Sequence, residues 1–192
     1  YTFNQLLTYD RKFGDHHFEA LVGHEFYKYR YDYLSATKTG FPFGGLYELD
    51  AATTITGASS YQNNYAVQSV LSRLNYDFAD KYYLSASFRT DGSSKFGKNN
   101  KYAFFPSFAF AWRASEESFL KSVHWLNNLK VRTSIGETGN QEIGNYAFFQ
   151  NLGSENAIFG DNYYTALYRS TFGNPDLKWE KTLQWDAGVD VS

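Results

Sequence analysis

The sequence predicts an all-β fold: a segment of a transmembrane β-barrel, with about seven antiparallel strands and long extracellular loops. Three observations predict it. Apolar and polar residues alternate along seven stretches, which is the period of a β-strand with two different faces. Aromatic residues are abundant, with 17 Tyr and 18 Phe in 192 residues, as aromatic girdles around a lipid-facing band would require. Connections between the stretches are short at one end and long at the other, as in outer-membrane barrels.

The first four predicted strands each keep their apolar side chains on one parity. The strands are 1–12, 17–31, 67–78 and 82–91. Their apolar residues are, in order, Phe3, Leu7 and Tyr9; Phe18, Ala20, Val22 and Phe26; Val70, Leu74, Tyr76 and Phe78; Tyr82, Leu84, Ala86 and Phe88. The residues between them are mostly charged, hydroxylated or amide side chains. The second half of the second strand, YKYRYDY, alternates tyrosine with charge instead.

The last three predicted strands repeat the pattern. They are 102–113, 129–136 and 177–191. Their apolar residues are Phe104, Phe108, Phe110 and Trp112; Leu129, Val131 and Ile135; Trp179, Leu183, Trp185, Ala187 and Val189, which we expect to face lipid. Pro106 cannot donate to a ladder and predicts a bulge. A strand of about 10 residues, tilted near 45°, spans about 23 Å, close to the apolar band of about 25 Å.

The connections at the two ends differ in length. If the first strand runs toward the cell interior, the tight turns 13–17 and 78–81 and the medium-length connection 114–128 share one end. The other connections, 32–66, 92–101 and 137–176, share the opposite end, and two of them are very long. Ser115, followed by two glutamates, predicts the N-cap of a short helix. Interfacial aromatic belts are expected at Tyr76, Phe78, Tyr82 and Trp112 on the short-turn end, and at Phe104 and Trp179 on the other.

Composition excludes several classes of protein. A net charge of −2 gives the chain no positive electrostatic potential that would attract a polyanion, so no nucleic-acid partner is expected. The absence of cysteine excludes a disulfide scaffold and a zinc–thiolate site. No apolar run approaches the roughly 18 residues of a transmembrane helix. Seven strands are an odd number and the last reaches the end of the chain, so we expect residues 1–192 to be part of a larger barrel.

Segments that resemble calcium-, phosphate- or metal-binding motifs are interpreted as structural. The segment DGSSKFGKNN (91–100) lacks the glycine and glutamate of a calcium loop. The glycine-rich run 136–144 lacks a phosphate-binding Lys-Ser/Thr and predicts turns. His16 and His17 are adjacent, and His24 and His124 are remote, so no metal site is predicted. We therefore assign no catalytic, cofactor-binding or metal-ligating residue and expect no enzyme. The inward charged residues indicate a solvated lumen, and substrate contacts stay unassigned: Arg73, Arg89, Arg113, Arg132, Glu180 and Asp186.

Three blocks resemble a known family. They are LSRLNYDFADKYYLSASFRTDGSSKFGKNNKYAFFPSFAFAW (71–112), ESFLKSVHWLNNLKVRTSIGETGNQEIGNYAF (117–148) and NPDLKWEKTLQWDAGVDV (174–191). They resemble, in the same order, the signature blocks of the SusC/RagA-type TonB-linked outer-membrane transporters of Bacteroidetes.

This resemblance implies a 22-stranded barrel in the outer membrane of a Gram-negative bacterium, with a plug domain and a TonB box that these residues do not contain. It also implies a SusD-like surface lipoprotein as a lid, energy from a TonB–ExbB–ExbD complex, and an oligosaccharide or peptide substrate. No cofactor is implied.

Two other classes of protein stay open from the sequence: a soluble carbohydrate-binding β-domain that uses the tyrosines of 27–33, and a passive porin or structural barrel. Aromatic residues in 137–176 predict an ordered segment. Either the strand extends through 145–152 above the membrane, or the segment forms a docking surface for the lid.

Overall fold

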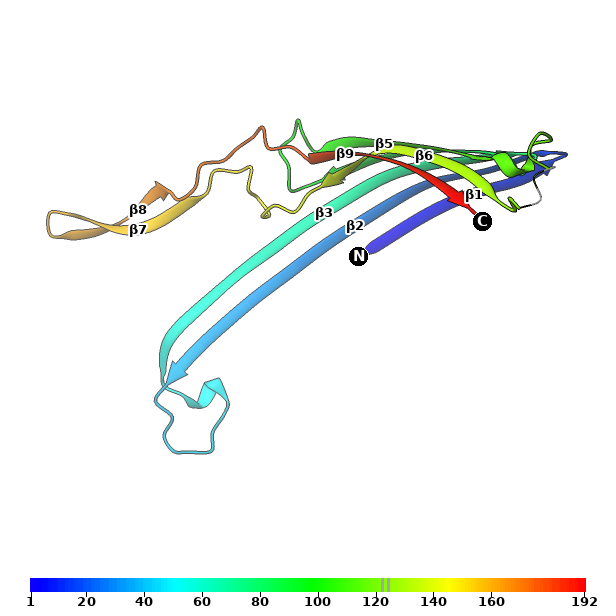
Figure 1. Ribbon diagram of the computed structural model, residues 1–192. Helices are drawn as coiled ribbons and strands as arrows, with labels where there is room; N and C mark the ends of the chain where they lie inside the picture. Colours follow the sequence, from blue (N-terminus) through cyan, green and yellow to red (C-terminus); the bar gives the residue numbers. More distant parts are fainter. Residues whose placement is uncertain (122, 124) are drawn as a thin grey trace.

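The computed structural model describes residues 1–121, 123 and 125–192, which fold mainly into antiparallel β-strands (Figure 1). Seven strands form one sheet in the order β1-β2-β3-β4-β5-β6-β9, and β7 pairs with β8 in a separate sheet. The strands are β1 (Thr2–Phe13), β2 (His16–Thr39), β3 (Thr54–Phe78), β4 (Tyr82–Ser93), β5 (Tyr102–Arg113), β6 (Leu129–Asn140), β7 (Leu152–Phe159), β8 (Asn162–Arg169) and β9 (Glu180–Val191). Two short 3-10 helices are η1 (Leu49–Ala51) and η2 (Ala114–Glu116).

The seven-stranded sheet confirms the predicted fold class. Its strand order follows the chain, and each neighbouring pair is antiparallel. Among the residues that the structure describes, no helix is both long and apolar enough to span a bilayer.

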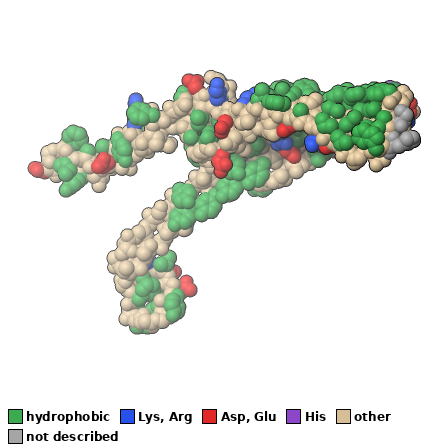
Figure 2. Space-filling model, in the orientation of Figure 1, with side chains coloured by type: hydrophobic (Ala, Val, Ile, Leu, Met, Phe, Trp, Pro, Cys, Tyr) green, Lys and Arg blue, Asp and Glu red, His purple; other side chains and the backbone are tan. Residues whose placement is uncertain are grey.

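The register brings the predicted apolar residues onto one face. One row of direct cross-strand partners runs through Tyr9, Ala20, Leu74, Ala86, Phe108, Ile135 and Trp185. The large side chains of this row lie about half or more in solvent when the chain stands alone: Ile135 is 48% exposed and Trp185 is 72% exposed. A broad hydrophobic patch covers this part of the molecule in Figure 2. A large apolar face on a sheet needs another apolar phase against it.

The short-turn end carries an aromatic cluster, as predicted for an interfacial belt. Phe78 stacks on Tyr82 with ring centroids 6.5 Å apart, and Tyr82 pairs directly with Trp112. The polar tips of Tyr82 and Trp112 converge on Glu117 in the β5–β6 connection, donating to Oε1 at 2.6 and 3.3 Å. The Tyr82 hydroxyl, followed by the Trp112 indole, lowers the pKa of the Glu117 carboxyl. The predicted Ser115 cap is wrong, because Ser115 lies inside η2 and Arg113 holds the N-cap position without a side-chain cap.

The predicted long loop 32–66 is mostly strand. β2 continues to Thr39 and β3 begins at Thr54, so the two form an extended hairpin with a register shift at Thr37 and Lys38. In Figure 1 the hairpin runs well beyond the other strands of the sheet. Tyrosine alternates with charge at 27–33, and the strand residues beyond carry mainly hydroxylated, amide and small side chains, so the hairpin has no continuous apolar face for lipid. The sequence pattern therefore predicted only the part inside the apolar band.

A small buried core lies at the long-loop end. Phe96 is fully buried and packs against Trp179 and Phe105, with ring centroids 5.1 Å apart for Phe96–Trp179 and 5.6 Å for Phe105–Trp179. The Trp179 indole nitrogen donates to the Lys101 carbonyl at 2.9 Å. The prediction that Trp179 faces lipid or belongs to a belt is wrong. β9 begins at the next residue, so the alternation of the strand does not reach Trp179.

The glycine-rich run also differs from the prediction. β6 extends through Gly139, which pairs with Lys181, so 136–140 is strand and not turn. A side chain at Gly139 would overlap the ring of Phe105, and a Cβ at Gly97 would lie 2.6 Å from the Pro175 carbonyl oxygen. These glycines allow segments that are far apart in sequence to approach closely.

Two further predictions fail. The β4–β5 register is continuous through Pro106, which pairs with Phe88 without a bulge. The β5–β6 register begins at Ser107, so Pro106 lies just beyond that ladder. The run 145–152 does not extend β6, because turns occupy its first part and Tyr146 has a φ of 65°. Tyr146, Phe148 and Phe149 lie in these turns, and most of the aromatic residues that follow lie on the β7–β8 hairpin, which projects from the molecule (Figure 1).

Candidate functional site

The polar face of the sheet carries the charged groups, and one arginine links three strands there. The Arg89 Nε atom on β4 donates to both Asp91 oxygens at 2.8 and 2.9 Å. Its Nη2 atom donates to Glu25 on β2 at 3.1 Å and to Ser69 on β3 at 2.9 Å. Asp91 and Ser69 are buried, so their polar atoms need these partners. Asp91 to Ser93 of the DGSS segment lie in β4, and Asp91 is held to the neighbouring strands through Arg89.

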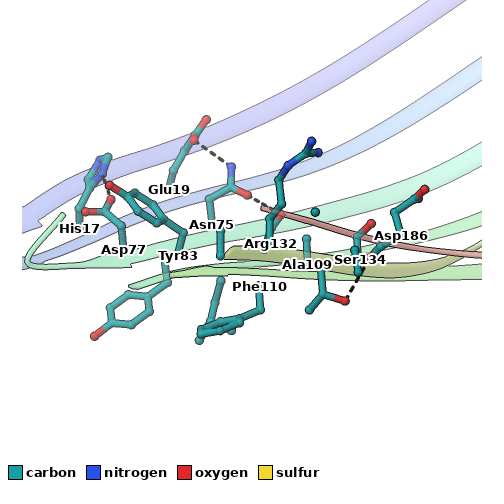
Figure 3. Close-up of a pocket in the computed structure, with 17 residues that line it drawn as sticks. His17, Glu19, Asn75, Asp77, Tyr83, Ala109, Phe110, Arg132, Ser134 and Asp186 are labelled. Atoms are coloured by element: carbon teal, nitrogen blue, oxygen red, sulfur yellow. Dashed lines mark hydrogen bonds and ion pairs between the residues drawn. The ribbon is translucent and has the colours of Figure 1, made fainter. Parts of the chain in front are cut away.

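A hollow of about 440 Å³ lies nearer the short-turn end of the sheet. Figure 3 shows polar side chains from β2, β3, β6 and β9 on one side of the strands, with Phe110 on the other. The polar residues that line the hollow include His17, Glu19, Asn75, Asp77, Tyr83, Ser85, Arg132, Ser134 and Asp186. The hollow therefore offers a polar molecule hydrogen-bond donors and acceptors as well as side chains of both charges.

Hydrogen bonds across the strands hold these polar groups in place. The Ser85 hydroxyl donates to the Asn75 side-chain oxygen at 2.7 Å, and the Asn75 amide donates to Glu19 at 3.0 Å. The His17 Nδ1 atom lies 2.6 Å from an Asp77 oxygen, and its Nε2 atom lies 3.3 Å from Asp10. Each contact except the one to Asp10 joins direct cross-strand partners. The sequence could not identify these pairs, because alternation assigns a face and not a register.

The charged residues predicted to face inward share one face but do not form one site. Arg132 and Asp186 line the hollow, and Arg132 pairs with Asp190 at 3.3 Å. Arg89 belongs to the three-strand network. Three others lie elsewhere on that face: Arg113 over the Tyr83 ring, Glu180 beside Asn140 at the long-loop end, and Arg73 opposite Leu21 and Ser87.

The histidines do not converge. His16 and His17 lie on opposite faces of β2, with His16 beside the Tyr76 hydroxyl at 2.8 Å. His24 lies beside Gln68 on β3, and His124 is outside the described residues. Among the described residues, no group of three or more His, Cys, Asp or Glu side chains is placed to hold a metal ion. The arrangement can bind polar molecules through hydrogen bonds and ion pairs, and its two faces suit two different solvents.

Comparison with known proteins gives one consistent result. The family model for the TonB dependent receptor-like β-barrel matches residues 1–192. TonB-dependent receptor P3 of Formosa agariphila is 38% identical over 97% of this chain, which covers 19% of that protein. TonB-dependent receptor SusC of Bacteroides thetaiotaomicron is 34% identical over 98% of this chain, which covers 19% of that protein.

A solved structure of the RagAB peptide transporter aligns with 99% of this chain at a TM-score of 0.87 and 33% identity. The alignment covers 21% of that transporter chain. The present chain thus spans about a fifth of the length of the proteins that it matches.

Proposed function

This chain belongs to the TonB-dependent receptor-like β-barrel family, and we propose that it forms part of the wall of a barrel that imports a large nutrient across the outer membrane. The observation that carries the proposal is the division of the sheet into two faces. One face is largely apolar and suits outer-membrane lipid, and the other is largely polar and suits a hydrated lumen. Membership of this family and the tight β1–β2 and β3–β4 turns at one end of the sheet both support this orientation.

The complete barrel is proposed to have 22 strands and to lie in the outer membrane of a Gram-negative bacterium. A plug domain would fill its lumen and a TonB box would link it to a TonB–ExbB–ExbD complex. The hollow beside Arg132 and Asp186 suits contact with a polar plug, because its cross-strand hydrogen bonds leave acceptors and donors facing the lumen. The wall supplies a path, and inner-membrane energy moves the plug. We expect no catalytic residue in it.

A SusD-like surface lipoprotein is the proposed lid. The β7–β8 hairpin supports this partner, since Ile158, Phe159, Tyr163 and Leu167 are 63–75% exposed. A two-stranded ribbon is marginally stable alone, and exposed aromatic and aliphatic residues in such a ribbon suit an interface. Deleting 156–168 should release the lipoprotein while leaving the barrel folded. Co-purification at full yield would show that the hairpin is not needed for docking.

Energised uptake tests the proposed function directly. Cells that express the full-length protein and its lipoprotein should accumulate a labelled oligosaccharide or peptide against a gradient. Accumulation should stop in a strain that lacks TonB and on addition of a protonophore, while surface binding of the label persists. Entry that continues at the same rate without TonB would support a passive porin instead.

The soluble carbohydrate-binding alternative is disfavoured by the exposed apolar face. Residues such as Leu84, Phe108 and Trp185 would stand in water on a free domain, at a large cost in hydrophobic free energy. Folding of the full-length protein should accordingly require detergent or lipid.

A further inference from the structure

Six tyrosines form two clusters on one face of the β2–β3 hairpin, beyond the apolar band. The inner cluster joins Tyr65 to Tyr27 and Tyr29, with ring centroids 5.6 and 5.2 Å apart. The outer cluster joins Tyr61 to Tyr31 and Tyr33, at 6.0 and 4.9 Å. We call these six residues the tyrosine face. They share the parity of Glu25, so this face continues the polar, lumen-facing side of the sheet.

The rings hold each other in place and yet stay accessible. Tyr31 is 41% exposed, Tyr33 38% and Tyr61 55%. Figure 2 shows a hydrophobic stripe along the hairpin. Two clusters four residues apart are separated by about 13 Å along the strand. Each tyrosine presents an apolar ring and a hydroxyl that can donate or accept, and it loses little conformational entropy on binding.

Charge distinguishes the two sides of the hairpin. On the tyrosine side, the residues around the outer cluster are neutral: Ser35, Thr37, Ser59 and Asn63. Glu25 lies on the same side beyond the inner cluster, where it accepts from Arg89. The charged residues Lys28, Arg30 and Asp32 have the opposite parity, and the Arg30 Nε atom donates to Asp32 at 2.8 Å. Lys95 reaches the foot of the tyrosine face, where its Nζ atom lies 5.1 Å from the Tyr65 ring centroid and donates to the Gln141 carbonyl. The outer cluster lies farther along the hairpin, away from this cation.

We propose that the tyrosine face is a binding site for a neutral oligosaccharide above the entrance to the lumen. Sugar rings present apolar C–H faces that pack on aromatic rings, and their hydroxyls can bond with tyrosine hydroxyls. A charged ligand would lose hydration on the outer cluster, where the neighbouring residues of the same parity are neutral. The inference rests on the proposed import function, because the face would hold the ligand on its way into the barrel.

The test uses the purified full-length transporter in detergent, so that it does not depend on energised uptake. Its probe is an array of neutral gluco-, manno- and xylo-oligosaccharides, together with uronic-acid oligosaccharides and mixed-sequence peptides. We expect binding to at least one neutral oligosaccharide. Tyr31→Ala combined with Tyr61→Ala should weaken this binding by about tenfold or more, as expected for the loss of two aromatic contacts. Leu34→Ala is the matched control, since Leu34 has the opposite parity and is 82% exposed.

Several outcomes would overturn the proposal. Unchanged oligosaccharide affinity in the double variant would do so, as would binding confined to acidic oligosaccharides or peptides. Loss of the lipoprotein partner with oligosaccharide binding intact would assign the face to protein docking. Heat-dependent gel migration would establish that each variant barrel is folded. Binding that depends on the tyrosines without TonB-dependent uptake would refute the import function alone, whereas uptake of a neutral oligosaccharide that is insensitive to the double variant would refute the tyrosine site alone.

Discussion

Arginine placed on the two faces of one strand should have very different effects. Ile135 lies on the apolar face and Ser134 on the polar face of β6. Ile135 is six residues along the strand from Leu129, the first residue of β6. At about 3.3 Å per residue and a tilt near 45°, it lies about 14 Å from the short-turn end, close to the middle of an apolar band of about 25 Å.

The depth of a residue in the bilayer determines how far an arginine there should lower the free energy of unfolding. Ile135→Arg should lower the free energy of unfolding by about 2–4 kcal/mol, the cost of arginine at the midplane. Leu84→Arg should cost about 1 kcal/mol or slightly more, since Leu84 is only two residues from the strand end at Tyr82, about 5 Å from the interface. Ser134→Arg should cost less than about 1 kcal/mol, because Ser134 lines the hollow and pairs directly with Asp186.

Equilibrium unfolding of the full-length barrel measures these differences. The protein would be refolded into phospholipid vesicles and unfolded in guanidinium, with tryptophan fluorescence as the signal. Equal losses for Ile135→Arg and Ser134→Arg would refute the assignment of faces. A cost at Leu84 equal to that at Ile135 would refute the depths that we derive from the distance of each residue to its strand end.

Three further predictions concern the two ends of the barrel. Gly139→Ala should destabilise the barrel by about 1–3 kcal/mol in the same unfolding measurement, because the new methyl group would overlap the packed Phe105 ring. A membrane-impermeant thiol reagent should label Ala58→Cys in intact cells and should miss Asp80→Cys; labelling of Asp80→Cys from outside would invert the topology. Glu117 has a lowered pKa, so its contribution to stability should be complete above its ordinary pKa and should disappear as pH falls through the lowered value. Glu117→Gln should remove this part of the acid dependence, and an unchanged pH profile would contradict it.

The membrane-spanning part of the wall could be predicted from sequence because one face contacts lipid and the other contacts water. Apolar and polar residues must therefore alternate along each strand, and the register confirms that Leu74, Ala86 and Phe108 share a row. The same alternation does not predict which residues pair across neighbouring strands. The contact between His17 and Asp77 and the hydrogen bonds of Arg89 were therefore found only in the structure. Residues at the edge of the band were predicted less well. Trp179 has the parity of the lipid face but lies just outside β9, in a buried aromatic core.

The extramembrane strands escaped prediction for a different physical reason. The hairpin 32–66 lies outside the apolar band, so no apolar face distinguishes it from a polar loop. The β7–β8 hairpin likewise has exposed residues on both faces and neighbours the turn at Tyr146 rather than a continuous strand. In both places β structure arises from backbone pairing and from tyrosine or mixed contacts across the hairpin, which single-sequence alternation does not reveal.

Measurement of lipid and water access along β9 tests the central claim most directly. Single spin labels would be placed in turn at each position from 182 to 189 of the full-length barrel in vesicles, and collisions with oxygen and with a water-soluble nickel chelate would be recorded. Oxygen access should peak at Leu183, Trp185, Ala187 and Val189, and nickel access should peak at the four positions between 182 and 188 that alternate with them. A pattern without a period of two residues, or one with the two faces exchanged, would contradict the placement of this wall between lipid and a hydrated lumen.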